Sequence, residues 1–447
     1  MFQKILVANR GAIARRVIRS LRQMGIRSVA VYSEADKDLP YLAEADETYA
    51  IGAAAPLESY LNQDLLLQII KESGADGVHP GYGFLSENAT FAARVNASGA
   101  RFIGPSPEWI EAMGHKTRAR ETMARYGMPM SPSSGLLDED WAATLAAAEK
   151  VGFPVLVKPA AGGGGIGMLA AHSAEELQNA VTQARSMAGR SFGSAEIYLE
   201  KLMVQPRHIE FQILADRHGN ACHLFERDCS IQRRHQKVIE ESPAPRLPRA
   251  DVEGMGDRIV QAMEASGYDV IGTAETLRDR DGLFSFLEMN TRLQVEHAVT
   301  EEITGIDLVA AQIRLAGGAR LNEVIPSQPQ INGHAIEVRI YAEDPVRFYP
   351  SPGTLKTLRL PSGPGVRVEC GFSEGNRITP YYDPMIAKCI VHAPDRAQAI
   401  AGMRAALEAT VIEGVKTNIP FAQKVLADAS FASGDVHTGL GMQILGQ

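Results

Sequence analysis

The first 112 residues alternate short apolar runs with amphipathic segments. The apolar runs predict strands at 4–8, 28–32, 101–104 and before the His79 loop, and the amphipathic segments predict helices at 11–21 and 64–72. Strands that alternate with helices favour an open parallel sheet with crossover helices. The spacing GxGxxG is absent after the first strand, which argues against a nicotinamide or flavin site. The loop His79–Gly83 follows a strand end, where open sheets bind ligands, although a plain tight turn is the alternative.

A glycine-rich segment follows a buried strand in the second part of the chain. Helical patterns near 107–126 and 139–150 precede the strand 153–159, and a helix near 173–188 and a strand at 196–203 come after the glycines. Positions 162–167 hold five glycines behind Lys158, so their backbone N–H groups can wrap a polyphosphate. No GK[ST] sequence follows, which excludes a Walker loop. A mobile flap over a nucleotide is favoured over a flexible linker, because strands flank the glycines and the Ser-rich composition of linkers is absent.

Polar side chains alternate with apolar ones along two strands predicted at 207–216 and 222–230. The first strand presents His208 and Glu210 on one face, because successive side chains point to opposite faces of a sheet. The second strand leads into a basic loop at 231–237. In an acidic protein we interpret this loop as an anion site rather than as a nucleic-acid patch.

A predicted hairpin brings carboxylates together. Two strand-like runs flank the turn Asp279–Gly282, and in either register Glu275 lies opposite or diagonal to Glu288. Glu288 and Asn290 share one face of the second strand, and hard divalent cations prefer such oxygen ligands. Two carboxylates at such a short distance repel each other unless a metal bridges them, so the hairpin predicts a metal site. The alternative for this charged strand end is a solvated turn.

The residues after this strand predict an anion site. If the chain stays extended, three more side chains continue on the same side, namely Arg292, Gln294 and Glu296. A cation, an amide and a carboxylate in this order suit a small anion that is held beside a general base.

The remaining residues predict a third, mixed unit. A strand pattern at 333–344 places Arg339 on the same face as Glu337, and a Gly/Pro-rich β-region at 350–391 is followed by a helix at 394–411. We expect an N-terminal domain at 1–112, a central domain at 113–330 with a lid at about 131–203, and a C-terminal domain at 331–447.

Composition narrows the functional class. The 447 residues are 45% hydrophobic and 22% charged, as in ordinary globular proteins. A net charge of −8 gives no reason to expect nucleic acid or an anionic membrane as a partner, and no apolar run approaches the roughly 18 residues of a membrane helix. No signal-peptide pattern opens the chain and the four cysteines lack disulfide spacing, so we expect reduced thiols in a cytoplasmic protein. Cys229 is interpreted as a buried, inert thiol.

Several strings of residues are specific enough to indicate a family. They are ANRG (8–11), HPGYGFLSEN (79–88), MGHK (113–116), VLVKPAAGGGGIGM (155–168), RHIEFQ (207–212), ERDCSIQRRHQKVIEE (226–241), EMNTRLQVEH (288–297) and YYDPMIAK (381–388). Together they resemble biotin carboxylase, of the ATP-grasp superfamily, over essentially the whole chain. The resemblance implies an α/β and α+β fold with an N-terminal open parallel sheet, a central ATP-grasp domain under a mobile glycine-rich lid, and a C-terminal mixed α/β domain.

The resemblance also implies roles for particular residues. ATP would be held by Lys116, Lys158, Gly163, Gly164, Gly165, Glu200, Lys201, Met203, His208, Gln232, His235 and Leu277. Magnesium or manganese, with two sites expected, would be bound by Glu275 and Glu288, with Asn290 close to them. Bicarbonate would be bound by Lys237, Arg292, Gln294, Val295 and Glu296, of which Glu296 would be the general base. Biotin would be bound by Arg339, with Tyr82 and Gly83 bordering its side of the cleft.

The activity that the resemblance implies is ATP- and bicarbonate-dependent carboxylation of biotin through carboxyphosphate. Bicarbonate is a weak nucleophile, but cations can hold it in line with the γ-phosphate, while metals and lysines stabilise the charge that develops. Glu296 would deprotonate bicarbonate, and Arg339 would offset the charge on the enolate form of biotin. Because no Met-Lys-Met biotinylation motif is present, we expect biotin on a separate carrier protein, with carboxyltransferase subunits and a homodimer as further associations.

Some positions depart from the family pattern without removing a proposed ligand. They are Ala12, His115, Ile166, Ala274, Thr276 and Ala298. Ile166 removes a possible phosphate contact in the flap and is also similar to the urea-carboxylase branch. We favour a subunit of an acetyl-CoA or other acyl-CoA carboxylase. The alternatives are a urea- or 2-oxo-acid-type carboxylase, an ATP-grasp ligase for another carboxylate, and a nucleotide-binding subunit without catalysis.

Overall fold

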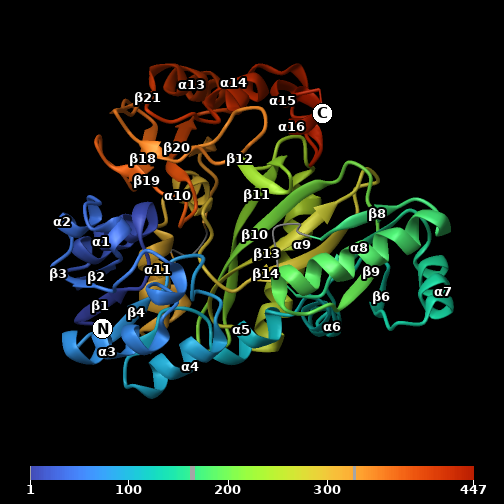
Figure 1. Cartoon of the computed structure of the whole chain (residues 1–447), viewed down its shortest axis with the longest axis horizontal. Coiled ribbons are helices and arrows are strands. Elements are labelled where there is room, and N and C mark those ends of the chain that lie inside the picture. Colours follow the sequence, from blue (N-terminus) through green and yellow to red (C-terminus); the bar gives the residue numbers. More distant parts are fainter. Residues whose placement is uncertain (1, 162–166, 326–328, 447) are drawn as a thin grey trace.

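The computed structural model describes residues 2–161, 167–325 and 329–446. The flap residues Gly163, Gly164, Gly165 and Ile166 lie outside the described residues. Figure 1 shows the N-terminal elements (blue) beside a long central sheet (green and yellow), the C-terminal elements (orange and red) above them, and a lobe of strands and helices on the right. None of the described helices combines the length and the apolar character that a membrane span needs.

The N-terminal elements form a sheet with the strand order β3-β2-β1-β4-β5. They are β1 (Lys4–Val7), α1 (Gly11–Gln23), β2 (Arg27–Tyr32), α2 (Tyr41–Glu44), β3 (Glu47–Ala50), α3 (Gln63–Ser73), β4 (Gly77–His79), α4 (Ala89–Ala97) and β5 (Arg101–Phe102). Their pairings are parallel, which confirms the expected open parallel sheet. The side chains of Ile5 and Val7 are fully buried, as in strands that helices cover. Asn62 caps α3 by accepting a hydrogen bond from Leu65 N, and Gly74 ends that helix with a left-handed φ of 66°.

Two short helices, α5 (Pro107–Met113) and α6 (Lys116–Arg125), lie where the sequence predicted one helix near 107–126. The prediction of a single helix was wrong, because the first helix ends before Gly114 and a second one begins at Lys116. The N–H of Lys116 donates to the carbonyl of Ala160 (3.1 Å) instead of continuing the first helix. The break places Lys116 at the start of α6, beside the strand that ends just before Ala160.

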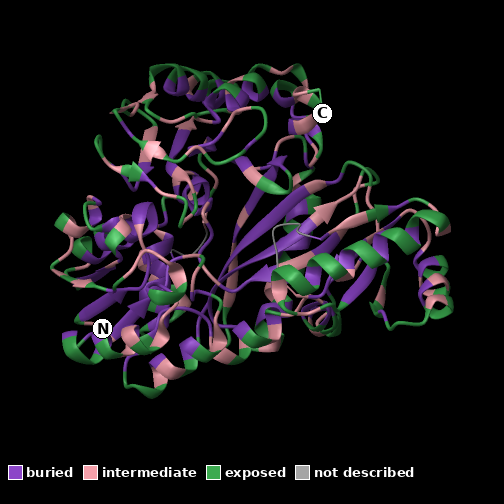
Figure 2. Cartoon of the chain, in the orientation of Figure 1, coloured by how far each residue is buried: buried purple, intermediate pink, exposed green. Residues whose placement is uncertain are grey.

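The lobe contains a sheet with the order β6-β9-β7-β8, whose paired strands are antiparallel. Its elements are β6 (Ser133–Leu136), α7 (Trp141–Val151), β7 (Val155–Pro159), β8 (Leu169–Ala171), α8 (Ala174–Phe192) and β9 (Ile197–Lys201). Val155 and Val157 are fully buried on one face of β7, and the intervening positions point to the other face. In Figure 2 the strands of this lobe carry buried positions, and the outer surfaces of its helices are exposed.

The largest sheet has the order β14-β13-β10-β11-β12-β15-β20-β18 among the described residues. Its strands are β10 (Arg207–Ala215), β11 (Ala221–Arg233), β12 (Gln236–Ser242), β13 (Val270–Arg278), β14 (Phe284–Asn290), β15 (His334–Tyr341), β18 (Val366–Cys370) and β20 (Met385–Ala393). The sheet runs across the boundary expected near residue 330, because β12 pairs with β15 and Glu240 lies opposite Glu337. Lys237 and Arg339 therefore belong to one sheet, although they lie far apart in the chain.

Helices cover the large sheet and complete the C-terminal unit. They are α9 (Arg249–Ser266), α10 (His297–Thr304), α11 (Leu308–Ala316), α12 (Leu321–Val324), α13 (Arg396–Ala409), α14 (Ile419–Ala427), α15 (Ala429–Ser433) and α16 (Leu440–Ile444). The smaller strands are β16 (Gly353–Thr354), β17 (Thr357–Arg359), β19 (Arg377–Ile378) and β21 (Val411–Glu413). Helix α9 packs on β11, and α10 packs on β15 and β11. Helix α13 confirms the helix expected at 394–411.

Candidate functional site

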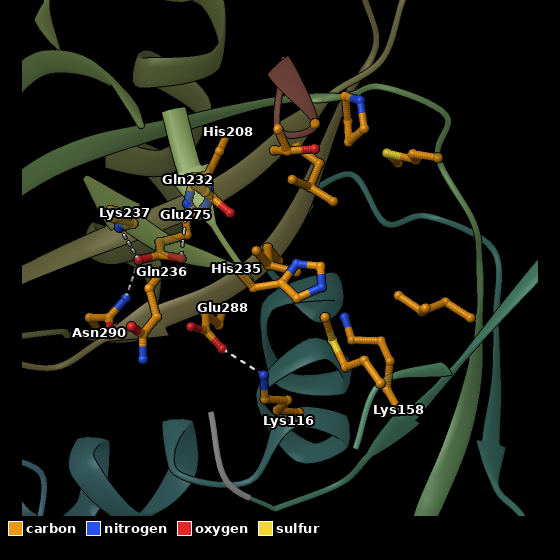
Figure 3. A pocket seen from close by; sticks show the side chains of 18 of the residues that line it. Lys116, Lys158, His208, Gln232, His235, Gln236, Lys237, Glu275, Glu288 and Asn290 are labelled. Atoms are coloured by element: carbon orange, nitrogen blue, oxygen red, sulfur yellow. Dashed lines mark hydrogen bonds and ion pairs between the residues drawn. The ribbon is translucent and has the colours of Figure 1, made fainter. Parts of the chain in front are cut away.

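A cavity of about 540 Å³ collects the site residues from the lobe, from α6 and from the large sheet. The described residues predicted for nucleotide, metal and bicarbonate all line it: Lys116, Lys158, Glu200, Lys201, Met203, His208, Gln232, His235, Lys237, Glu275, Leu277, Glu288, Asn290, Arg292, Gln294, Val295 and Glu296. Arg339 lines it as well. Figure 3 shows ten of the lining side chains labelled, with Lys158 approaching from the lobe strand and Glu275 and Lys237 from the sheet.

Lys158 and Glu200 form a buried ion pair on the lobe side of the cavity. Lys158 Nζ lies 2.7 Å from Glu200 Oε2, and Arg120 Nη1 lies 3.3 Å from Oε1. Burial favours the neutral acid, but the charges of Lys158 and Arg120 outweigh it and lower the pKa of Glu200 to about 2. Lys201 also lines the cavity, and its ammonium donates to the carbonyls of Gly152 and Phe153.

The carboxylates of Glu275 and Glu288 face each other across the β13–β14 hairpin. They are direct cross-strand partners, as the sequence predicted for one of its two registers. Glu275 Oε1 accepts from Lys237 Nζ, Asn290 Nδ2 and Gln294 Nε2, each at 2.8 Å. On the other strand, Glu288 Oε2 lies 3.0 Å from the ammonium of Lys116. Two lysines therefore offset part of the repulsion between the carboxylates of Glu275 and Glu288. The sequence predicted a metal alone in this role.

The predicted basic loop at 231–237 is instead a strand hairpin, because β11 continues to Arg233 and β12 begins at Gln236. Only Arg234 and His235 form the turn, with left-handed φ values of 46° and 66°. Two of the loop's arginines make other contacts. Arg233 pairs with Glu343, and Arg234 lies over the ring of Tyr349. Gln232, His235 and Lys237 of this hairpin line the cavity, whereas Arg233 and Arg234 do not, and the anion site stays a prediction.

Lys237 has its ammonium among three carboxylates. Its Nζ lies 2.5 Å from Glu210, 2.8 Å from Glu275 and 2.7 Å from Glu296. Burial lowers the pKa of Lys237, but these neighbours reverse the effect and raise it well above its ordinary value. Lys237 is therefore a fixed positive charge at the centre of an acidic site. Cys229 lies nearby, and burial raises the pKa of its thiol, in agreement with an inert cysteine.

The segment 291–296 does not stay extended, contrary to the sequence-based expectation. β14 ends at Asn290, and the chain turns before α10 begins at His297. The side chains of Arg292, Gln294 and Glu296 nevertheless line the same cavity as the hairpin residues, because polar partners hold the turn. Arg292 Nη2 donates to Asn290 Oδ1 (2.9 Å), and Arg292 Nε donates to Glu87 (2.7 Å).

Glu296 is held between two cations. Besides Lys237, Arg339 Nη2 lies 2.9 Å from Glu296 Oε2, while Arg339 Nε lies 2.6 Å from Glu240. Burial favours the protonated acid, but Lys237 and Arg339 outweigh it and hold the pKa of Glu296 below its usual range. Glu296 is therefore a carboxylate that can accept a proton once a ligand competes for these cations.

A second cavity of about 540 Å³ adjoins the first. Tyr82 and Gly83 line it, and Arg292, Val295 and Arg339 line both cavities. The loop that carries Tyr82 is fixed from the end of β1: the Asn9 amide donates to the carbonyls of Pro80 (2.7 Å) and Tyr82 (2.8 Å).

Several lining or supporting residues carried no assignment from sequence. They are Leu156, Met168, Leu202, Gln205, Pro206, Gln236, Leu287, Tyr341, Asp383, Thr438 and Gly439 in the lining, and Glu87, Arg227, Glu240 and Lys388 behind it. Leu156 could have been found, because it shares a strand face with Lys158. Thr438 could not, since it reaches the cavity through a long-range bond from its N–H to the carbonyl of Pro206 (2.9 Å).

The chain matches three family profiles along its length. They are described as biotin carboxylase, N-terminal domain (residues 1–110), carbamoyl-phosphate synthase L chain, ATP binding domain (115–324), and biotin carboxylase C-terminal domain (337–440).

Similar proteins agree with these profiles. A biotin carboxylase of Halalkalibacterium halodurans is 51% identical over 98% of this chain and 97% of its own length. A pyruvate carboxylase subunit of Methanothermobacter thermautotrophicus is 48% identical over 98% of this chain and 89% of its length. The biotin carboxylase domain dimer of Hydrogenobacter thermophilus 2-oxoglutarate carboxylase, solved with MgADP, ADP and bicarbonate, has a TM-score of 0.96 and 45% identity, covering 100% of this chain and 99% of that one.

Proposed function

Because this chain belongs to the biotin carboxylase family of ATP-dependent ligases and has its ATP-grasp fold, we propose that it carboxylates carrier-bound biotin from ATP and bicarbonate through carboxyphosphate. The observation that carries the proposal is the junction of the two cavities. Arg292, Val295 and Arg339 line both, and Glu296 lies beside Arg339. A nucleotide in one cavity and a ureido ring in the other can therefore use the same cations and the same carboxylate.

Nucleotide binding is assigned to the first cavity. Lys116 and Lys158 supply the positive charge that a triphosphate needs, and Leu156, Leu202 and Leu277 offer apolar surface for a base. In phosphoryl transfer the protein contributes mainly alignment and charge stabilisation, which fixed lysines provide. A Lys158→Met variant is therefore expected to weaken ATP binding.

The residues of the β13–β14 hairpin fit a divalent metal. Two directly paired carboxylates, Glu275 and Glu288, lie beside the amide of Asn290 at the cavity surface, and oxygen ligands of this kind suit magnesium or manganese. The MgADP complex of the 2-oxoglutarate carboxylase domain supports this assignment. A bound metal would neutralise charge on the phosphates. Lys237 outweighs the effect of burial and holds the pKa of Glu275 well below its usual range, so this carboxylate is ionised and able to act as a ligand. Glu288 forms an ion pair with Lys116.

Bicarbonate is assigned to the junction of the cavities, and Glu296 is assigned as its general base. Lys237 and Arg292 attract the anion, and Gln294 is held beside them by Glu275. A bound anion shares Lys237 with Glu296, which weakens the ion pair and raises the basicity of the carboxylate. The base is thus activated only when its substrate is present.

Biotin is assigned to the second cavity. Tyr82 and Gly83 line it together with Arg339, whose guanidinium is fixed by Glu240 and Glu296. A cation that is already oriented can stabilise negative charge on the deprotonated ureido ring without reorganising.

Two further proposals concern the protein that carries biotin and the final acceptor of the carboxyl group. We propose a separate carrier protein and an acyl-CoA carboxyltransferase as the first candidate partners. The relatives named for pyruvate and 2-oxoglutarate favour a 2-oxo acid as the second candidate. Supplying the chain with carrier and transferase proteins and following labelled bicarbonate into acetyl-CoA, pyruvate, 2-oxoglutarate or urea separates these acceptors.

The activity is tested by coupled measurement of ADP release. ATP cleavage should require bicarbonate and should increase with free biotin. ATP turnover that depends on neither substrate would contradict the proposal. Cleavage that depends instead on another carboxylic acid would indicate an ATP-grasp ligase of different specificity.

A further inference from the structure

Lys388, the last residue of the string YYDPMIAK, lies behind the first cavity, and the proposed function assigns no role to it. It lies on β20, and its side chain is completely buried. Burying an ammonium ion is costly unless hydrogen bonds and opposite charges compensate for the lost water. The groups that surround Lys388 therefore indicate what the residue is for.

The ammonium of Lys388 has both a backbone partner and carboxylate partners. Its Nζ donates to the carbonyl of Val295, and it lies 3.1 Å from Glu369 Oε2 and 3.4 Å from Glu337 Oε2. Lys388 is the cross-strand partner of Arg339 on β15, so the two side chains share one face of the sheet. That face receives the turn 291–296, in which Val295 precedes the proposed base.

Holding the Val295 carbonyl fixes the peptide before Glu296. The peptide unit is planar and trans, so a carbonyl held on one side directs the following N–H to the other. The preceding carbonyl is held as well: His297 Nδ1 lies 2.8 Å from Gln294 O, and since a carbonyl only accepts, this nitrogen carries the proton. Two successive carbonyls of the turn are thus held in place by side chains.

We propose that Lys388 is a positioning residue for the bicarbonate site. By binding the Val295 carbonyl, it sets the peptide plane from which Glu296 extends toward Lys237 and Arg339. This inference rests on the proposed function, because it assumes that Glu296 is the base and that the turn binds bicarbonate.

A purely structural role would act through charge, since Lys388 also pairs with Glu369 and Glu337. The two roles separate in a pair of variants. Lys388→Met removes both the hydrogen bond and the charge at similar length, whereas the double variant Lys388→Met with Glu337→Gln restores the charge balance without restoring the hydrogen bond.

We expect Lys388→Met to raise the KM for bicarbonate about tenfold or more and to lower kcat, because small misplacements of reacting groups are costly. The KM for ATP should stay within about twofold, since Lys388 contacts none of the lysines of the nucleotide cavity. The double variant should recover thermal stability while keeping the defect toward bicarbonate. Kinetics with ATP, bicarbonate and free biotin varied separately, and the midpoint of thermal unfolding, give these values.

Lys4→Met is the matched control. Lys4 is also a buried lysine, donating to the carbonyl of Ser73 (2.6 Å) and pairing with Glu47 (2.6 Å), but it lies in the N-terminal sheet away from both cavities. The Lys4→Met protein should have a lower midpoint of thermal unfolding but an unchanged KM for bicarbonate.

The outcomes separate this inference from the proposed function. If the unaltered chain shows no ADP release that depends on bicarbonate, both fail. If it is active and Lys388→Met has an unchanged KM for bicarbonate, or the double variant regains normal bicarbonate kinetics, only the positioning role is overturned. Should Lys388→Met fail to fold, the charge-balanced double variant carries the test, and failure of both to fold would assign Lys388 to structure alone.

Discussion

The chemistry of Glu296 depends on its neighbours more than on its own residue type. A buried carboxylate tends to be neutral, yet Lys237 and Arg339 keep Glu296 ionised in the absence of ligands. Glu240 in turn fixes Arg339, and Arg227 fixes Gln294 through a hydrogen bond of 2.6 Å. Each proposed catalytic group thus has a buried partner that sets its charge or direction.

Replacing the proposed base tests this arrangement. Glu296→Gln keeps the shape of the side chain but cannot accept a proton, so kcat/KM for bicarbonate should fall by roughly 10²–10⁴-fold. Measurement of ADP release with bicarbonate varied gives this ratio. Glu72→Gln, an exposed change on α3, serves as the control. A loss below about tenfold in a folded Glu296→Gln protein would remove Glu296 from the role of base.

The ion pair of Glu200 predicts a pH effect on stability. Its pKa in the folded chain is about 2 instead of 4.5, so the ionised group stabilises the fold above pH 4.5, and this stabilisation is lost as the pH falls toward 2. Glu200→Gln should reduce the free energy of unfolding by on the order of 3 kcal/mol near neutral pH. The difference from the unaltered chain should shrink toward pH 2. Urea denaturation across this range measures it, and a difference independent of pH would contradict the ion-pair account.

Among the elements, two hairpins of the large sheet supply polar groups of the first cavity. The β11–β12 hairpin supplies Gln232, His235 and Lys237, and the β13–β14 hairpin supplies Glu275 and Glu288. In the second hairpin the register shifts after Glu275, where Thr276 pairs with Phe286 and leaves Leu287 as a bulge. The bulge lets Leu287 and Glu288 both line the cavity, which strict alternation would forbid.

The metal assignment of this hairpin can be tested at Glu288. Glu288→Gln removes one negative ligand, so the magnesium concentration that gives half-maximal activity should rise about tenfold or more. Excess magnesium should restore part of the activity if the defect lies in metal binding. Titration of activity with magnesium and with manganese measures the shift, and an unchanged metal requirement would place the ion elsewhere. Glu264→Gln on α9 is a control outside the site.

Across the whole molecule, the second cavity lies where the N-terminal and C-terminal units meet. Asn9–Ile13 and Tyr82 come from the first unit, and Phe372 and Tyr382 come from the last. The units touch backbone to backbone at Gly371, where a Cβ would lie 2.5 Å from Ala12 N and 2.9 Å from Gly11 Cα. Any side chain at this position must push α1 away from the C-terminal unit.

Gly371→Ala therefore tests how closely the units must meet. We expect a several-fold rise in the KM for free biotin, little change for ATP, and a loss of about 1–3 kcal/mol in the free energy of unfolding. Gly254→Ala on α9, where a Cβ has open space, should leave the kinetics unchanged. Equal effects of the two substitutions on the KM for biotin would contradict the importance of this contact.

The sequence by itself determined most of the elements and which side chains share a strand face. Alternation placed Glu288 and Asn290 on one face, turn residues predicted the hairpin that pairs Glu288 with Glu275, and specific strings identified the family. These signals are local, because strand period and turn chemistry depend on neighbours a few residues apart. Domain limits and residue roles remain predictions from the sequence.

Only the tertiary structure decided which distant groups support the site. The pairing of β12 with β15, the turn of 291–296 that brings Glu296 to Lys237, and the placement of Lys388 against Val295 all depend on contacts between segments far apart in the chain. Likewise, the interruption between α5 and α6 at Gly114 accompanies the hydrogen bond from Lys116 N–H to the carbonyl of Ala160, which no local sequence pattern predicts. The physical reason is the same in each case: the charge and direction of a buried polar group are set by what packs against it, and packing is a property of the folded chain.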